Sequence, residues 1–282
     1  MKLITYRAGG KVHIGKTDGV GISRLDHLLD HLVTDLTDLI ADWEHLEGEV
    51  AQAQGQDDAI ADVELLAPIL RPGKILGLGM NYADHVREAG MEIPADQIWF
   101  TKAVTSVNGP FAPIQLPRVS TALDYECELV FIIGKRCRHV SVEDAPGVIF
   151  GYCAGNDVSV RDWQLKTSQF MLGKSFDTHA PFGPWIVTPD DIDPLDLPIR
   201  TLVNGETRQS SNTRNFIFTP AAQIAHLSQA MTLEPGDVIF TGTPGGVGAA
   251  MKPPQFLKAG DVVRVEIDGI GAIENRVEPE GA

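Results

Sequence analysis

The sequence contains only three cysteines, Cys127, Cys137 and Cys153, and they show no CxxC spacing. An odd number without that spacing argues against a disulfide framework and against a zinc ribbon, so we predict a reducing, cytoplasmic location. Long apolar runs are missing too, since nowhere do about 18 apolar residues follow one another, and no basic region leads into an apolar core after Met1. We therefore expect neither a membrane span nor a secretory signal peptide.

The sequence is also poor in positive charge, with 23 Lys and Arg against 38 Asp and Glu and a net charge of −15. A field of this sign repels nucleic acids and anionic lipid surfaces, so neither is expected as a partner. It repels small anionic substrates as well, and a site for one needs a local cation or a metal ion. The hydrophobic residues, 43% of 282, suffice for a large core in one big domain or two unequal ones.

The first part of the chain predicts a small mixed unit. Residues 2–22 alternate and contain turn glycines, which is typical of a small β element. Apolar residues three or four apart over 25–43 predict a helix with Ser23 as its N-cap. His27 and His31 are four apart on this helix, but no third metal ligand accompanies them, so we interpret them as part of an exposed polar face.

A domain boundary is predicted near residue 70, because 51–59 is polar and of low complexity and 68–74 carries two prolines and a glycine. This gives a small N-terminal α+β domain at 1–70 and a larger domain at 71–282. The larger domain consists of short apolar strands punctuated by Gly and Pro. Its Asn-Gly signal, in VNGE, predicts a hairpin. Helix-like stretches occur only near residues 82–90, 158–170 and 219–231. The fold class is therefore α+β and mostly β, with a mostly antiparallel or mixed sheet.

An acidic pattern interrupts one of these strands. The stretch DYECELVF places Asp124, Glu126 and Glu128 at alternate positions, and in a strand such positions share a face. The carboxylates of Glu126 and Glu128 repel each other there. An edge strand facing water is one interpretation, but the apolar run ELVFIIG indicates burial on both faces. A hard divalent cation, Mg²⁺ or Mn²⁺, would offset the repulsion.

Further polar residues follow the next predicted strand. Asp157 in GYCAGNDVSVRDWQ lies at the end of that strand, where sites are commonly built. Arg161 and Gln164 come four and seven residues later, on one face if the segment is helical. An N-cap followed by an ordinary surface helix is the alternative interpretation. Lys174 in MLGKSFD provides the local cation that the net charge requires.

A histidine and a carboxylate occur together in NYADHVRE. His85 and Glu88 are three residues apart and adjacent on a helical turn. A carboxylate beside an imidazole can orient it, so that the histidine activates a water as general base. Taken alone, such a pair is more often part of a protein surface.

Six motifs in this order resemble the fumarylacetoacetate hydrolase family over residues 72–277. They are NYADHVRE, DYECELVFIIG, GNDVSVRDWQ, GKSFDTHAPFGPW, MTLEPGDVIFTGTPGGVG and KAGDVVRVEIDGIG. The resemblance implies a β-roll or sandwich-like catalytic domain, usually homodimeric, that binds Mg²⁺ or Mn²⁺ and processes keto or diketo acids. The chain is most similar to a bacterial subgroup often labelled ureidoglycolate lyase. That subgroup includes 2,4-diketo-3-deoxy sugar acid hydrolases and carries a comparable small N-terminal domain.

The resemblance also implies roles for individual residues. It assigns as metal ligands Glu126, Glu128 and Asp157. It assigns as catalytic residues His85 and Glu88, the water-activating pair on a lid, and Lys174. It places on the substrate side Arg161, Gln164 and Thr243. Asp124 falls outside the matched ligands, and we expect a supporting or solvent-facing role for it. Met80 is a local departure, because many relatives carry Lys or Arg there. The first 70 residues carry no motif with assignable chemistry.

The reaction that the resemblance implies is hydrolytic cleavage of a C–C bond in a 2,4-diketo acid, an acylpyruvate or a sugar-acid derivative. The products would be pyruvate, or a pyruvate derivative, and an acid. Two alternatives use the same enolate, namely decarboxylation of an oxaloacetate-like keto acid and isomerisation of a hydroxydienedioate. A catalytically idle metal- or ligand-binding relative is a further alternative. In each catalytic case the expected partner is a small anionic keto acid.

Overall fold

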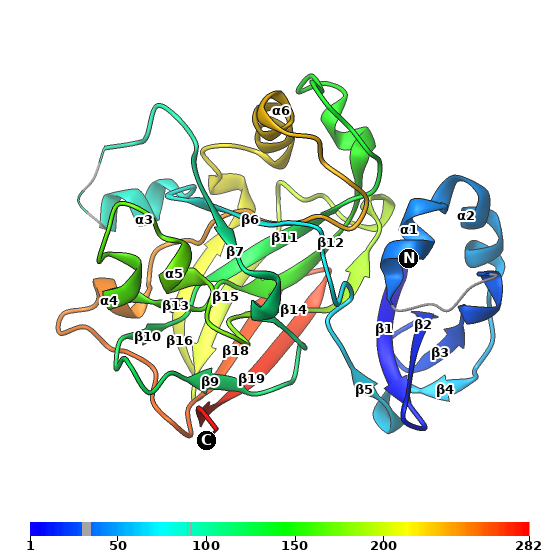
Figure 1. Cartoon of the computed structure of the whole chain (residues 1–282), viewed down its shortest axis with the longest axis horizontal. Coiled ribbons are helices and arrows are strands. Elements are labelled where there is room, and N and C mark those ends of the chain that lie inside the picture. Colours follow the sequence, from blue (N-terminus) through cyan, green and yellow to red (C-terminus); the bar gives the residue numbers. More distant parts are fainter. Residues whose placement is uncertain (30–34, 89, 91, 282) are drawn as a thin grey trace.

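Two β-sheets with a shared apolar core form the centre of the chain in the computed structural model, which describes residues 1–29, 35–88, 90 and 92–281 (Figure 1). The larger sheet has twelve strands. Ten of them run in the order β4 (Asp58–Ala59), β3 (Gly21–Arg24), β2 (Lys11–Thr17), β1 (Lys2–Ala8), β14 (Ala180–Val187), β12 (Ile149–Asn156), β11 (Cys127–Ile133), β17 (Val238–Phe240), β6 (Ile75–Gly79) and β7 (Ile98–Lys102). The other two, β5 (Glu64–Leu65) and β8 (Val107–Asn108), pair with β1 and β14.

The smaller sheet has five strands, and a short two-stranded ribbon lies apart from both sheets. The order in the smaller sheet is β16 (Glu206–Asn212), β15 (Pro198–Val203), β18 (Val262–Ile267), β19 (Gly271–Pro279) and β9 (Ile114–Leu116). The ribbon consists of β10 (Leu123–Asp124) and β13 (Ser159–Val160). The α-helices are α1 (Leu36–Ala41), α2 (Trp43–Gln52), α3 (Ala83–Glu88), α4 (Arg161–Gln164), α5 (Met171–Lys174) and α6 (Pro220–Ala230). The predicted α+β, mostly β class is confirmed.

Strand β11 is buried along its whole length, as its unbroken apolar sequence predicts. On one face Leu129 and Phe131 pack into a core that includes Val265 of the smaller sheet. On the other face Val130 and Ile132 pack into a second core. Because side chains alternate along a strand, Glu128 shares the face of Val130 and Ile132. The Glu128 side chain is therefore buried beside the apolar core that contains Val130 and Ile132.

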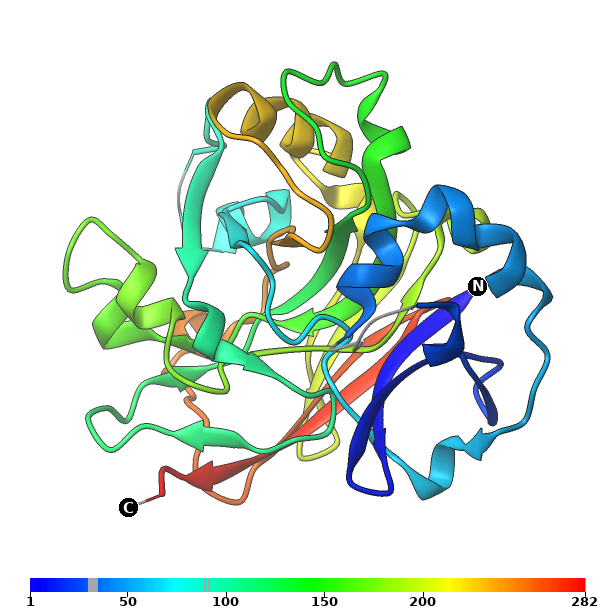
Figure 2. The same cartoon turned by 45° about the vertical axis from the view of Figure 1, so that its right-hand side comes forward.

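The N-terminal region joins the larger sheet through β1. Lys2 pairs with Val187 of β14, and Trp43 packs edge-on against Phe150 with ring centroids 4.9 Å apart. Figure 2 shows α1 and α2 beside the N-terminal strands at this end of the sheet. The boundary near residue 70 stays a prediction.

Two expectations for helices were wrong. Ser23 lies in β3 and caps no helix. A 3-10 helix covers Asp26–Leu28, and the α-helix α1 follows later. The N-cap of α1 is Asp35, whose side chain accepts a hydrogen bond from the Thr37 amide. His31 and the middle of the predicted helix lie outside the described residues. The stretch 158–170 contains only the one-turn helix α4, because β13 occupies its first part.

Other local predictions were correct. The hairpin between β15 and β16 turns at Asn204 and Gly205, whose φ angles of 52° and 82° suit an Asn-Gly turn. Helices α3 and α6 occupy the stretches near 82–90 and 219–231. None of the described helices has both the length and the apolar character needed to cross a membrane.

Candidate active site and metal centre

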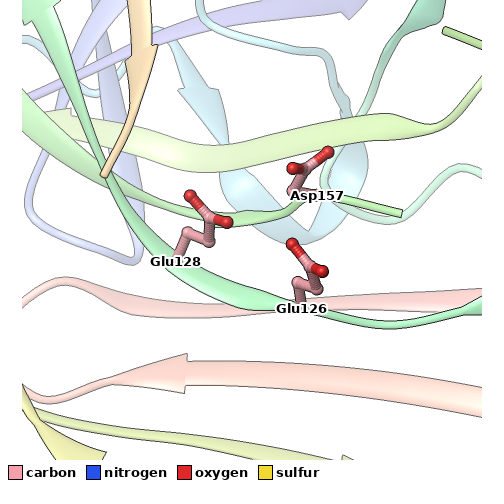
Figure 3. Close-up of side chains that lie close together, drawn as sticks. All are labelled: Glu126, Glu128 and Asp157. Carbon is pink, nitrogen blue, oxygen red and sulfur yellow. The ribbon is translucent and has the colours of Figure 1, made fainter. Parts of the chain in front are cut away.

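Three acids meet where β11 begins and β12 ends. Glu126, Glu128 and Asp157 each offer one carboxylate oxygen, and these atoms lie within 4.8 Å of one another (Figure 3). The pairing of Cys127 with Asn156 sets this geometry, because it places the residues just before β11 beside those just after β12. The Asp157 amide donates a hydrogen bond of 2.9 Å to the Glu126 carbonyl, which fixes the junction.

Three buried cations surround two of these acids. Lys174 Nζ lies 2.8 Å from Glu126 Oε2 and 2.7 Å from Asp157 Oδ2. Arg161 Nη1 lies 2.6 Å from Glu126 Oε1, and Lys102 Nζ lies 2.6 Å from Asp157 Oδ1. Burial disfavours the charged form of Glu126, but Lys174 and Arg161 outweigh it and lower the pKa of this carboxyl. Burial also disfavours the Lys174 cation, yet Asp157 and Glu126 raise its pKa.

Glu128 is the acid of the triad that forms no ion pair among the described residues. Its carboxylate accepts a 2.7 Å hydrogen bond from the Gly242 amide. Burial, followed by the charges of Asp157 and Glu126, raises the pKa of Glu128 well above its usual range. A positive charge is therefore missing at this carboxylate. Three hard oxygen donors with such a deficit fit a divalent cation such as Mg²⁺ or Mn²⁺, and these three residues would hold it.

Asp124 contacts the site through Arg161. It is fully buried, and its Oδ2 accepts a 2.8 Å hydrogen bond from Arg161 Nε. The amides of Gly248 and Ala249 donate to the same carboxylate at 2.8 and 2.9 Å. The solvent-facing role considered for Asp124 is therefore excluded. The residue ties the arginine to the loop after β17.

A cavity of about 190 Å³ opens beside the acids and cations. Its polar lining consists of His85, Glu126, Arg161, Gln164, Lys174 and Thr243, and its apolar lining includes Leu78, Met80, Ile98, Phe100, Leu165 and Phe170. Arg161 is oriented from both sides, because Nη1 also donates to Gln164 Oε1 at 2.9 Å. Its Nη2 is buried and has no hydrogen-bond partner, so it is available to an anion in the cavity.

Helix α3 contributes His85 to the lining of this cavity and is held to the smaller sheet and to the loop after β17. His85 lines the cavity, and its Nδ1 lies 3.5 Å from Glu88 Oε2 without forming a hydrogen bond to it. The Glu88 carboxylate accepts the Gly246 amide at 2.9 Å through Oε2. Ser211 donates a hydrogen bond of 2.9 Å to Asp84 Oδ2. Of the two predicted lid residues, His85 lines the cavity and Glu88 does not, and the role of this segment as a lid stays a prediction.

Two residues of the site were missed from the sequence. Lys102 is the last residue of strand β7 and the only buried one in it, and a lone lysine in the apolar stretch IWFTKAV was the available signal. Gln209 of β16 donates to the Thr243 hydroxyl at 2.8 Å across 34 residues of sequence, and the strand pattern around it gave no such signal. A larger cavity of about 950 Å³, formed by residues 63–71 and 104–113, shares no lining residue with this site.

Comparison with known proteins gives consistent matches. A family model described as fumarylacetoacetate (FAA) hydrolase C-terminal matches residues 74–278. A mitochondrial oxaloacetate tautomerase of Homo sapiens is 40% identical over 287 residues, which cover 98% of this chain and 91% of that protein. The structure of maleylpyruvate hydrolase from Sphingobium sp. SYK-6, in complex with manganese(II) ion and pyruvate, matches with a TM-score of 0.85 at 32% identity and covers 100% of both chains.

A third match has yet another activity in its name. The structure of 5-carboxymethyl-2-hydroxymuconate delta-isomerase from Mycobacterium smegmatis has a TM-score of 0.80 at 36% identity and covers 99% of this chain and 100% of that one. The three proteins are named as a tautomerase, a hydrolase and an isomerase. The resemblance seen in six sequence motifs is confirmed by the family model and by the full-length matches. The chain belongs to the fumarylacetoacetate hydrolase family of enzymes.

Proposed function

We propose that this chain is a divalent-metal-dependent enzyme that forms the enol of a small 2-keto acid, with oxaloacetate as the substrate to test first. The observation that carries the proposal is the cavity of about 190 Å³, which is lined by His85, Arg161 and Lys174 together with Glu126 of the acid triad. Cavities for drug-sized ligands start at about 300 Å³, so this one suits a molecule of few carbons. The full-length similarity to an oxaloacetate tautomerase supports the choice of substrate.

The proposed reaction needs a base, an anion site and a stabilised enolate. A cation bound to Glu126, Glu128 and Asp157 would supply Lewis acidity at the carboxylate and keto oxygens of the substrate. His85 Nε2 takes a proton from C3, the C2–C3 double bond forms, and the C2 oxygen takes up a proton from water. Lys174 stays protonated between two carboxylates and stabilises charge on the C2 oxygen.

Arg161 would bind the substrate carboxylate through the unpartnered Nη2, and Thr243 would face the same anion. These roles agree with the polar lining of the cavity. The buried cations bind an anion locally although the net charge of the chain is −15. The proposal includes the homodimer and the cytoplasmic location predicted from the sequence.

Hydrolytic cleavage of a 2,4-diketo acid is a second candidate. It is favoured by the His85–Glu88 pair, which is placed to activate a water, and by the pyruvate in the maleylpyruvate hydrolase structure. In this reaction the water attacks the C4 carbonyl, the C3–C4 bond breaks, and a pyruvate enolate leaves and is protonated at C3. Decarboxylation of oxaloacetate would pass through the same enolate.

A substrate panel separates the candidates. The protein, loaded with Mg²⁺ or with Mn²⁺, is given oxaloacetate, acetylpyruvate and a 2,4-diketo-3-deoxy sugar acid, and kcat/KM is measured for each. We expect the ultraviolet absorbance of enol-oxaloacetate to relax to its keto–enol equilibrium faster with enzyme than without, with no release of pyruvate. If acetylpyruvate is cleaved with a higher kcat/KM, the hydrolase replaces the tautomerase. No turnover of any of the three would overturn both.

A further inference from the structure

Gln209 occupies the space between the acid-bearing strand β11 and the loop that follows β17. It lies on β16 of the smaller sheet, is 1% exposed, and does not line the cavity. A buried amide needs partners for two donor hydrogens and for its oxygen. The side-chain amide of Gln209 makes four hydrogen bonds, with Cys127, Thr201, Thr243 and Pro244.

The orientation of the Gln209 amide is fixed by two backbone groups. The Cys127 amide can only donate, and it lies 3.0 Å from Oε1. The Pro244 carbonyl can only accept, and it lies 2.8 Å from Nε2. An amide turned by 180° would lose both bonds, so the oxygen must face β11 and the nitrogen must face the loop. The second Nε2 hydrogen then goes to Thr243 Oγ1 at 2.8 Å.

This bond determines what the Thr243 hydroxyl can do. Because its oxygen already accepts from Gln209, its own hydrogen is free to donate elsewhere. The Cys127 thiol lies near this hydroxyl, but sulfur is a weak acceptor. Thr243 also lines the cavity, so a carboxylate bound there is the stronger acceptor.

We propose that Gln209 is a positioning residue, which makes the Thr243 hydroxyl a donor to the substrate carboxylate. The inference rests on the proposed function, because it needs an anionic keto acid in the cavity. It assigns to β16 a role in substrate recognition although no β16 residue lines the cavity. It also predicts that the contribution of Gln209 to binding passes through the hydroxyl of residue 243 and through no other group.

The test is a set of double variants read by ligand binding. Gln209→Glu keeps the oxygen that faces Cys127 and Thr201 and, when ionised, removes the donor that faces Thr243. Gln209→Met removes both without adding a charge. Each change is made in three backgrounds, namely the wild type, Thr243→Ser, which keeps a hydroxyl, and Thr243→Val, which lacks one. The Kd for pyruvate and for oxalate is measured by calorimetry in the presence of Mg²⁺, and KM and kcat for oxaloacetate are measured beside it.

We expect both Gln209 variants to raise Kd and KM by roughly tenfold in the wild type and in Thr243→Ser, the amount for one hydrogen bond to a charged group. In Thr243→Val they should change Kd by less than about twofold, because no hydroxyl is left to orient. Equal losses in all three backgrounds, or no loss in the wild type, would overturn the inference while leaving the proposed function intact. A wild-type protein that binds neither pyruvate nor oxalate and does not act on oxaloacetate would overturn the proposed function and the inference with it.

Discussion

Lys102 Nζ lies 2.6 Å from Asp157 Oδ1, and the side chains of both residues are 0% exposed. The pair joins the end of β7 to the residue that follows β12, so it links strands that are not neighbours in the sheet. Burial lowers the pKa of Lys102, and the Asp157 charge opposes that shift. The arrangement commits a lysine to the acid triad before any cation or substrate is bound.

We predict that Lys102→Met destabilises the metal-free protein by about 1–3 kcal/mol, because Asp157 Oδ1 loses its buried charged partner while Oδ2 keeps its contact with Lys174. Thermal unfolding measures the loss as a drop in Tm. The control is Lys135→Met, since Lys135 pairs with Glu44 at 3.1 Å on the surface with both side chains exposed. Such surface pairs contribute about 0–1 kcal/mol. Equal Tm values for the two variants would show that the buried Lys102–Asp157 pair stabilises the protein no more than the surface pair does.

Glu128→Gln is predicted to have opposite effects with and without metal. The raised pKa means that the folded protein holds a proton on Glu128 after the unfolded chain has released it. Metal-free stability therefore falls as the pH rises from about 4.3 through the higher folded pKa. Gln carries no such proton, so this part of the pH dependence should disappear and the variant should have the higher Tm at pH 8.

The same variant should respond weakly to metal. Wild-type protein gains stability from Mg²⁺ or Mn²⁺ by mass action, and the gain depends on affinity. Removing one of three anionic donors should raise the Kd for the cation at least tenfold and reduce the Tm gain accordingly. Differential scanning fluorimetry over a metal titration measures both quantities. A Tm gain equal to that of the wild type would show that Glu128 does not hold the cation.

Ser211→Ala is predicted to loosen the lid. The change removes the 2.9 Å hydrogen bond from Ser211 to Asp84 on α3 and also the 3.1 Å bond that Ser211 Oγ accepts from Asn215 Nδ2. One neutral or charge-assisted hydrogen bond corresponds to about 0.5–3 kcal/mol, so kcat/KM should fall by at least roughly twofold. Ser210→Ala is the matched control, because Ser210 is the neighbouring exposed residue of the same strand and points to the other face. Equal kinetics for the two variants would mean that this bond does not help to close α3.

His85→Asn is predicted to lower kcat by at least about 100-fold, because the variant lacks the general base. The gain in Tm on adding metal should stay at the wild-type level. Glu88→Gln should have a smaller effect on kcat, because an amide oxygen can still accept the Gly246 amide that Glu88 accepts at 2.9 Å. Glu88→Ala loses that contact as well and should be worse. Full activity in the His85 variant would require a different base.

The position of the acid triad was predictable because residues close together in the sequence determine it. Alternation placed Glu126 and Glu128 on one face, and the end of the next strand placed Asp157 beside them, as the pairing of Cys127 with Asn156 confirms. The strand itself is interrupted, since β10 ends at Asp124 and β11 begins at Cys127. That interruption lets Asp124 turn to Arg161, a contact that spacing cannot predict.

The missed contacts depend on the packing of distant elements. Lys102 reaches Asp157 across 55 residues, and Gln209 reaches Thr243 across 34. Whether a polar residue of a strand faces water or a buried partner depends on which sheet covers it, and the periodicity of one strand carries no such information. The helix predicted to begin after Ser23 failed for a related reason, because β3 pairs with β2 and takes Ser23 into the sheet.

Strand β1 has a consequence for the whole chain. It pairs with β14 through Lys2 and Leu3, and Leu3 belongs to the same apolar core as Val130 and Ile132 of β11. A chain that starts at residue 71 would leave the β14 edge without its partner and would uncover that core. Unpaired apolar edges recruit strands from other molecules. We therefore expect a chain that lacks the first strand to self-associate more readily than the whole chain.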